Sequence, residues 1–472
     1  MVGKNEAMVS KVSLSKKDEA FRNFSLTGNM WRVIFSVCTP LALYQSLNQI
    51  FKILDSMMAS HISAESVSAV AYLSQINLML SAIGGGLAIG GSLKISQAYG
   101  LGDYKLVRER VNGLYGICAM LGLGVLLFIA PFTTGFLKLA NTPDELIEIG
   151  RTYFIVELIG MVISFFNNVY IAIERSRGSS RRILKLNMVS IIIKLLLTAF
   201  FVYVLQSGIT MIAVATVISN SIIFIASIVN LVGREDAFGV NFKSMRLKKD
   251  VTIPMLHLSF PVITEKVAFA FGKVIINSMS TMYGVLTVGA LGISNNIGGM
   301  TTNPQNGFQE GGAAIISQNL GANKPERALD SFKKVVIINI GIGLLGMGIT
   351  MGFLGYISKI FGGDNKEFCD LIGNVYYYEA WGLIPLGLNS AVMSLLYGFG
   401  YTKITLLINF SRVFIFRVPV LWALQRFTDI GSKSVGIVML ISNSLVGIMA
   451  VIVSIIVIRN ICKEYQIKFF NR

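Results

Sequence analysis

The chain has 472 residues, of which 53% are hydrophobic and 14% are charged, and its mean hydropathy is +0.66. Soluble domains carry roughly 25% charged residues, so this composition excludes an ordinary water-soluble protein and indicates a polytopic membrane protein. The formal net charge of +16 would suit either a nucleic acid or a membrane surface, and the positions of the basic residues decide between them.

Twelve apolar segments are long enough to cross a bilayer, which takes about 20 mostly apolar residues. We therefore predict an all-α fold with helices near residues 31–58, 66–93, 112–137, 149–173, 183–205, 209–232, 254–280, 286–317, 335–361, 371–397, 404–424 and 435–458. The predicted organisation is a cytoplasmic tail over 1–30, a six-helix bundle over 31–232, a basic linker over 233–253, a second bundle over 254–460 and a tail over 461–472.

Basic residues concentrate on one side of the predicted membrane. The tails and inner loops hold 29 of the 41 Lys and Arg residues, whereas the outer loops hold six and the spans six. By the positive-inside rule, this asymmetry places both termini in the cytoplasm, and we expect a bacterial plasma-membrane protein. Anionic lipid head groups are a sufficient partner for the basic loops, so we expect no nucleic-acid partner. The linker is expected to be a solvated connection.

The two predicted bundles are related by an internal repeat. At an offset of 221 residues, the Ile-Ser-Gln of 95–97 aligns with that of 316–318, and Lys52 aligns with Lys273. The same offset pairs Pro40 with Pro261, Gly86 with Gly307, Gly90 with Gly311 and Gly100 with Gly321. Six helices bring the chain back to its starting side, so the two copies are parallel. Parallel repeats are typical of transporters whose halves rock around a path between them.

Asp55 lies inside the first apolar segment, one helical turn after Lys52. A charge near the middle of a bilayer costs about 3 kcal/mol on insertion scales, so such residues usually face a protein interior or a water-filled path. Asp55 is therefore a candidate functional residue. The alternative is a permanent Lys-Asp ion pair that only holds helices together.

Several motifs resemble the multidrug and toxic compound extrusion (MATE) family. They are Asp55, the Ile-Ser-Gln-Ala-Tyr-Gly of 95–100 and the Ile-Ser-Gln-Asn-Leu-Gly-Ala-Asn-Lys-Pro-Glu-Arg-Ala of 316–328, and the resemblance covers about residues 30–460. It implies two six-helix bundles that form a V. It also implies an antiporter that exports amphiphilic drugs or toxic organic compounds in exchange for protons or sodium ions. We expect a monomer in the lipid bilayer, without cofactor, metal or enzymatic activity.

The resemblance also suggests which residues couple transport to an ion. Asp55 matches the family's first-helix aspartate, which serves in ion coupling. Where the family often has Asn and Asp on its fifth helix, this chain has Lys194 and Thr198. A cation site wants several oxygen ligands and net negative charge, and a buried lysine opposes both, so we favour the proton over sodium. The expected ion-coupling residues are Asp55, Lys52, Lys194 and Thr198.

Candidate substrate-binding residues come mainly from other polar groups in apolar segments. Glu265 and Glu379 lie on the seventh and tenth predicted helices, one to two turns before the acidic positions of sodium-driven relatives, and Lys266 could pair with Glu265. Glu310 could contact a cationic substrate or pair with a lysine. Tyr378 could line a cavity or belong to an aromatic belt. The full candidate set is Asn48, Glu265, Glu310, Glu379 and Tyr378.

Charge balance leaves a second transport function open. The predicted membrane interior holds six basic residues and five acidic ones, which is a poor cage for a bare cation. The balance indicates either internal ion pairs or tolerance of anionic or zwitterionic substrates. The alternative function is therefore a flippase or exporter of lipid-linked or anionic metabolites in the same superfamily. An intramembrane enzyme would need clustered aspartates or a histidine-centred site, and the only histidines, His61 and His257, lie in different halves.

Overall fold

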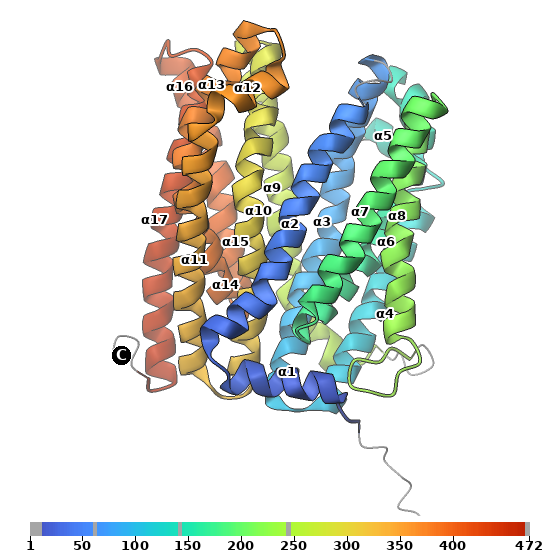
Figure 1. The fold of residues 1–472 in the computed structure, drawn as a ribbon, viewed down its shortest axis with the longest axis vertical. Coiled ribbons are helices and arrows are strands. Elements are labelled where there is room, and N and C mark those ends of the chain that lie inside the picture. The colour runs from blue at the N-terminus through green and yellow to red at the C-terminus, as the bar shows by residue number, and fades with distance from the viewer. Residues whose placement is uncertain (1–11, 60–63, 140–143, 242–246, 468–472) are drawn as a thin grey trace, which may run out of the picture.

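The computed structural model describes residues 12–59, 64–139, 144–241 and 247–467, which are almost entirely helical (Figure 1). The first half contains α1 (Lys16–Thr27), α2 (Met30–Ala59), α3 (Ala64–Leu101), α4 (Tyr104–Phe128), α5 (Thr133–Leu139), α6 (Asp144–Ser176), α7 (Ser180–Ala199) with a π-helical turn at Phe200–Val204, and α8 (Ile209–Leu231). The second half contains α9 (Lys249–Ser280), a 3-10 turn at Thr281–Tyr283, α10 (Val285–Gly321), α11 (Pro325–Gly352), α12 (Leu354–Gly362), α13 (Lys366–Trp381), α14 (Leu383–Gly398), α15 (Thr402–Phe410), a π-helical turn at Ser411–Ile415, α16 (Val418–Phe427) and α17 (Lys433–Glu464).

These helices confirm the predicted all-α fold and its twelve spans. Eight described helical segments are long and apolar enough to cross a membrane, and α13 and α14 form a further span bent by 47°. The other three, α2, α9 and α10, are 30, 32 and 37 residues long. Several predicted ends were wrong: α3 runs to residue 101 rather than 93, and α4 covers 104–128 rather than 112–137. The extra turns of α3 are polar but face protein. A prediction of helices from apolar length alone therefore leaves them out.

The helices form two bundles that lie close together at the end that carries α1 and separate toward the opposite end (Figure 1). We call the first of these the α1 end. The bundles meet through crossed contacts, because α3 of the first half packs on α9 of the second, and α10 packs on α2. Each half therefore rests its second long helix against the first long helix of the other half.

Glycines of the internal repeat allow this close approach. A β-carbon on Gly90 would overlap the backbone of Ser259, and a β-carbon on Gly311, the copy of Gly90, would overlap Cys38. Nearest the α1 end, a β-carbon on Gly100 would overlap the carbonyl oxygen of Gln318. The repeat-related contact is made by Gly321 and Gln97. The interface between the halves therefore has the pseudo-two-fold symmetry that the sequence repeat predicts.

Helix α1, which the sequence analysis treated as part of a tail, bridges the two halves. Arg22 donates hydrogen bonds to the carbonyl oxygens of Tyr99 and Gly100 in α3, at 2.9 and 2.8 Å. Ser25 donates to Oε1 of Gln318 in α10 at 2.7 Å. Arg327 in α11 donates to the carbonyl oxygen of Ser25 at 3.1 Å. The helix is thus bonded to both bundles where they meet.

We had expected the linker between the halves to be a solvated connection, but part of it is buried. Ala237, Phe238 and Val240 are fully buried, and Phe238 packs edge-on against Tyr99. Asn112 of α4 donates a hydrogen bond to the carbonyl oxygen of Gly239 at 3.1 Å. Small and aromatic residues amid the basic ones hold this segment against the first bundle.

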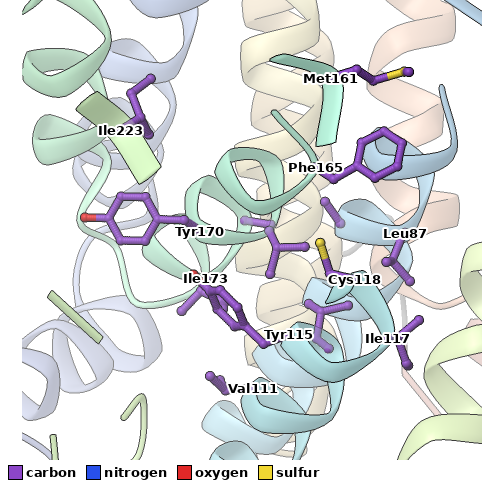
Figure 2. Close-up of a cluster of buried hydrophobic side chains, with 14 of the residues drawn as sticks. Leu87, Val111, Tyr115, Ile117, Cys118, Met161, Phe165, Tyr170, Ile173 and Ile223 are labelled. Atoms are coloured by element: carbon purple, nitrogen blue, oxygen red, sulfur yellow. The ribbon is translucent and has the colours of Figure 1, made fainter. Parts of the chain in front are cut away.

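The interior of the first bundle is a continuous apolar core. Figure 2 shows Tyr115, Cys118 and Phe165 among the side chains of this cluster, which come from several helices. Cys118 and Cys38 are buried and free. Thiols in such surroundings act as small apolar groups, so these two cysteines serve as packing residues.

We predict that Gly321→Ala lowers the apparent thermal unfolding midpoint in detergent. The added methyl group would overlap the Gln97 carbonyl oxygen, and overpacking costs about 1–3 kcal/mol. Gly348→Ala in α11 is the matched control, because nothing lies within 4 Å of its β-carbon position and alanine favours helix over glycine. Equal midpoints for Gly321→Ala and the unsubstituted protein would contradict the proposed steric role.

Candidate functional site

A cavity of about 500 Å³ lies between the two bundles. This is within the usual range of about 300–1,000 Å³ for small-molecule sites. Both halves contribute lining residues, from α2, α3, α6 and α8 on one side and from α9, α10, α17 and the start of α16 on the other. Lys52 lies near the end of α2 that is remote from α1, so the cavity lies toward the end where the bundles separate (Figure 1).

The charged groups of this cavity are mostly basic. Among the described residues its lining contains Lys52, Lys273, Arg417 and a single carboxylate, Glu157. Lys52 and Lys273 are copies of each other under the internal repeat. Each half therefore places one equivalent lysine at the cavity.

Neutral groups hold the basic side chains of the second half. Arg417 donates hydrogen bonds from Nε to Ser442 Oγ and from Nη2 to Asn443 Oδ1, both at 3.1 Å. Arg412 donates to the same Asn443 oxygen at 3.0 Å. The ammonium group of Lys273 lies 5.3 Å from the ring centre of Phe269, a cation–π contact. These contacts hold the basic side chains in position, and because the partners are neutral they do not neutralise the positive charge.

The predicted ion-coupling residues lie on two helices that pack together, α2 and α7. Lys52 lines the cavity. The backbone of Asp55 belongs to α2, but its side chain lies outside the described residues. Lys194 is half-buried. Thr198 is fully buried, and its hydroxyl has no hydrogen-bond partner within the described part of the chain.

Glu265 is buried away from the lining, in the interior of the second bundle. Its carboxylate accepts hydrogen bonds from Tyr397 at 2.9 and 3.0 Å, from Thr405 at 2.8 Å and from Asn409 at 2.6 Å. All of these donors are neutral. We had considered an ion pair with Lys266, and the structure instead surrounds the carboxylate with hydroxyl and amide groups.

Three other candidates also lie outside the cavity lining. Glu379 is buried on α13 and accepts a hydrogen bond from the hydroxyl of Ser294. Tyr378 is half-buried and lies against Gly436 of α17. Asn48 is half-buried on α2. Direct substrate contact by these three residues would need a different arrangement of the helices.

Glu310 forms an ion pair with Arg175, rather than with a lysine. Arg175 is at the end of α6 and Glu310 is in α10, so the pair joins the two halves. Arg175 is 5% exposed and Glu310 is 23% exposed. The sequence analysis missed this role because Arg175 stands in a run of basic residues that looks like an ordinary inner loop.

The sequence analysis also missed most of the polar groups in the cavity. Glu157 accepts a hydrogen bond from Asn77 at 3.2 Å. Isolated asparagines in apolar segments are the signal that could have revealed this set. The lining includes five of them: Asn77, Asn220, Asn277, Asn295 and Asn296.

Over the described ranges, no group of three or more His, Cys, Asp or Glu residues is arranged to hold a metal ion.

The MatE family model matches residues 40–200 and again residues 261–423. The chain belongs to the MATE family. The two matched segments begin 221 residues apart, which is the offset of the internal repeat. A probable multidrug resistance protein of Bacillus subtilis is 20% identical to this MATE chain over 410 residues, covering 85% of it and 88% of the relative. A multidrug export protein of Staphylococcus haemolyticus is 22% identical over 333 residues, covering 69% and 72%.

Solved structures of MATE transporters have the same fold. An outward-facing multidrug resistance MATE transporter of the MOP superfamily superposes with a TM-score of 0.87 at 18% identity, covering 95% of this chain and 99% of that one. A MOP superfamily transporter from Pyrococcus furiosus, whose pocket of reverse polarity suggests a different function, matches with the same TM-score, identity and coverage. This MATE chain is thus a multi-pass membrane transporter with two bundles arranged as a V.

We predict that Arg175→Gln lowers the free energy of unfolding by about 2–3 kcal/mol. This is below the 3–5 kcal/mol typical of a fully buried pair, because Glu310 remains partly exposed. Glu310→Gln should have a similar effect, and the double variant should recover part of the loss. Denaturant titration of all four proteins gives the coupling energy.

The surface pair of Lys248 and Glu109, with side chains 52% and 29% exposed, supplies the control for this experiment. Lys248→Gln should cost at most about 1 kcal/mol. Additive effects of the two substitutions in the Arg175–Glu310 cycle would show that the pair does not stabilise the contact between the halves.

Proposed function

We propose that this MATE protein is a secondary active antiporter that exports amphiphilic organic compounds in exchange for protons. The observation that carries the proposal is the cavity between the bundles, which residues of both halves line. Relatives that are named for multidrug resistance and multidrug export support the substrate class.

The positive-inside distribution of basic residues supports a cytoplasmic position for the α1 end and both termini. The structure would then be outward-facing, with its cytoplasmic side held together by glycine contacts, by α1 and by the Arg175–Glu310 pair. Rocking the bundles would have to break these contacts to expose the cavity inside. Pro304 within α10 removes one helical hydrogen bond and gives this helix a place to bend.

Proton coupling is proposed for Asp55 in the first half, with Glu265 as a second acidic group. The hydroxyls of Tyr397 and Thr405 donate to the Glu265 carboxylate. Hydroxyl groups can both donate and accept, so the same partners could accept a hydrogen bond from a protonated Glu265. Lys194 and Thr198 take the places where family members often offer Asn and Asp, which favours a proton over sodium at Asp55.

We predict that a pH gradient, acidic outside, drives export of fluorescent amphiphiles from proteoliposomes, and that a sodium gradient alone does not. Asp55→Asn and Glu265→Gln should each reduce gradient-driven transport by about tenfold or more, the range expected when a proton-transfer group is lost. Both should keep substrate exchange in the absence of a gradient, because the cavity and the bundles remain.

Glu464→Gln is the control, since Glu464 is exposed at the end of α17. Retained exchange shows that a variant is folded and active, so loss of gradient-driven transport then reports coupling. Stimulation by sodium alone would refute proton coupling. Normal pH-driven transport in Asp55→Asn or Glu265→Gln would remove that residue from the mechanism.

A further inference from the structure

We propose that the cavity binds substrates through an anionic head group, held by Lys52 and Lys273 with the help of Arg417. This rests on the proposed transport function and names the charge of its substrate. The geometry that points to it is a cavity of about 500 Å³ whose described lining contains three basic groups and one carboxylate.

The nearby carboxylate of Glu379 offsets this positive charge only in part, because it acts on Lys273, Arg412 and Arg417 together. None of the ion pairs found among the described residues involves Lys273 or Arg417. The hydrogen-bond partners of Arg417 are the neutral Ser442 and Asn443. Basic groups in a cleft with low-dielectric walls concentrate anions and repel cations. A cation in this cavity would face Lys52, Lys273 and Arg417, with Glu157 as the single counter-charge in the described part of the lining.

The internal repeat gives the two lysines a specific role. Lys52 and Lys273 belong to opposite halves and act electrostatically on one another. A carboxylate, sulfonate or phosphate group has several acceptor oxygens and can bind both ammonium groups at once. Such a ligand would relieve their repulsion and join the two halves. Its affinity would then depend on how far apart the bundles stand, which a substrate of an alternating-access transporter requires.

The rest of the lining suits an amphiphile. Asparagine amides can donate to anionic oxygens or accept from hydroxyls, and the lining contains several of them. Apolar surface for the body of the substrate comes from Leu78, Met161, Ile276, Leu291 and Met439. The inferred ligand is therefore an organic anion with an apolar body, of a size that fits a cavity of about 500 Å³.

The test compares two xanthene dyes of similar size, carboxyfluorescein as the anion and rhodamine 6G as the cation. Binding is measured by fluorescence polarisation on the full chain in phosphatidylcholine nanodiscs, and pH-driven transport is measured in proteoliposomes. We expect carboxyfluorescein to bind more tightly. Lys52→Gln, Lys273→Gln and Arg417→Gln should each weaken its binding by about tenfold, as expected for loss of one charged hydrogen bond.

Two further variants make the result specific. Lys273→Arg keeps the charge and should retain binding to within a few-fold, which separates charge loss from misfolding. Arg426→Gln removes an exposed basic residue of the same half that lies outside the cavity lining and should leave binding unchanged.

The outcomes separate the two proposals. Tighter binding of rhodamine 6G, or carboxyfluorescein binding that is unchanged in Lys52→Gln and Lys273→Gln, overturns the anionic site even if pH-driven transport is present. Carboxyfluorescein binding that depends on both lysines, without any pH-driven transport, supports the anionic site and counts against antiport.

Discussion

The close approach of α3 and α10 to the opposite half is the constraint on which the architecture depends. Glycine at repeat-related positions brings backbone against backbone, so that Gly100 meets Gln318 and Gly321 meets Gln97. Small residues at helix crossings replace the hydrophobic driving force that is missing inside a bilayer. The contact is concentrated toward one end of the molecule, and the bundles diverge from it (Figure 1). The cavity lies toward the opposite end, where the halves separate.

Polar contacts reinforce the same end. The Arg175–Glu310 pair and the hydrogen bonds of Arg22 and Ser25 all cross between the halves or bind α1 to them. When a polar contact opens, its hydrogen-bonding groups can replace their protein partners with water. An apolar interface would instead expose its whole surface, at a free-energy cost that grows with area. A combination of glycine packing and a few polar bonds therefore gives a closure that is specific but still able to open.

The sequence was sufficient for the features that depend on composition and repetition. Twelve spans, two parallel halves and the pairing of Lys52 with Lys273 all follow from apolar length and from the 221-residue offset. It was insufficient where tertiary packing overrides local pattern. Helix α1 and the buried Phe238 looked like parts of polar, solvated segments, because their partners come from distant residues such as Tyr99. Glu265 looked like an ion-pair candidate because Lys266 is its neighbour in sequence, yet adjacent residues on a helix point in different directions.

The two kinds of charge in the interior differ in how they follow the repeat. Lys52 and Lys273 are a symmetric pair, one from each half. The two carboxylates proposed for coupling are not duplicated, since Asp55 aligns with Ile276 and Glu265 aligns with Tyr44. A substrate that must be handled equally by both halves as they rock is well served by symmetric groups. A coupling ion needs only one site whose environment changes with the motion. The lysines therefore fit substrate binding, and the two carboxylates without a copy in the other half fit coupling, within one duplicated scaffold.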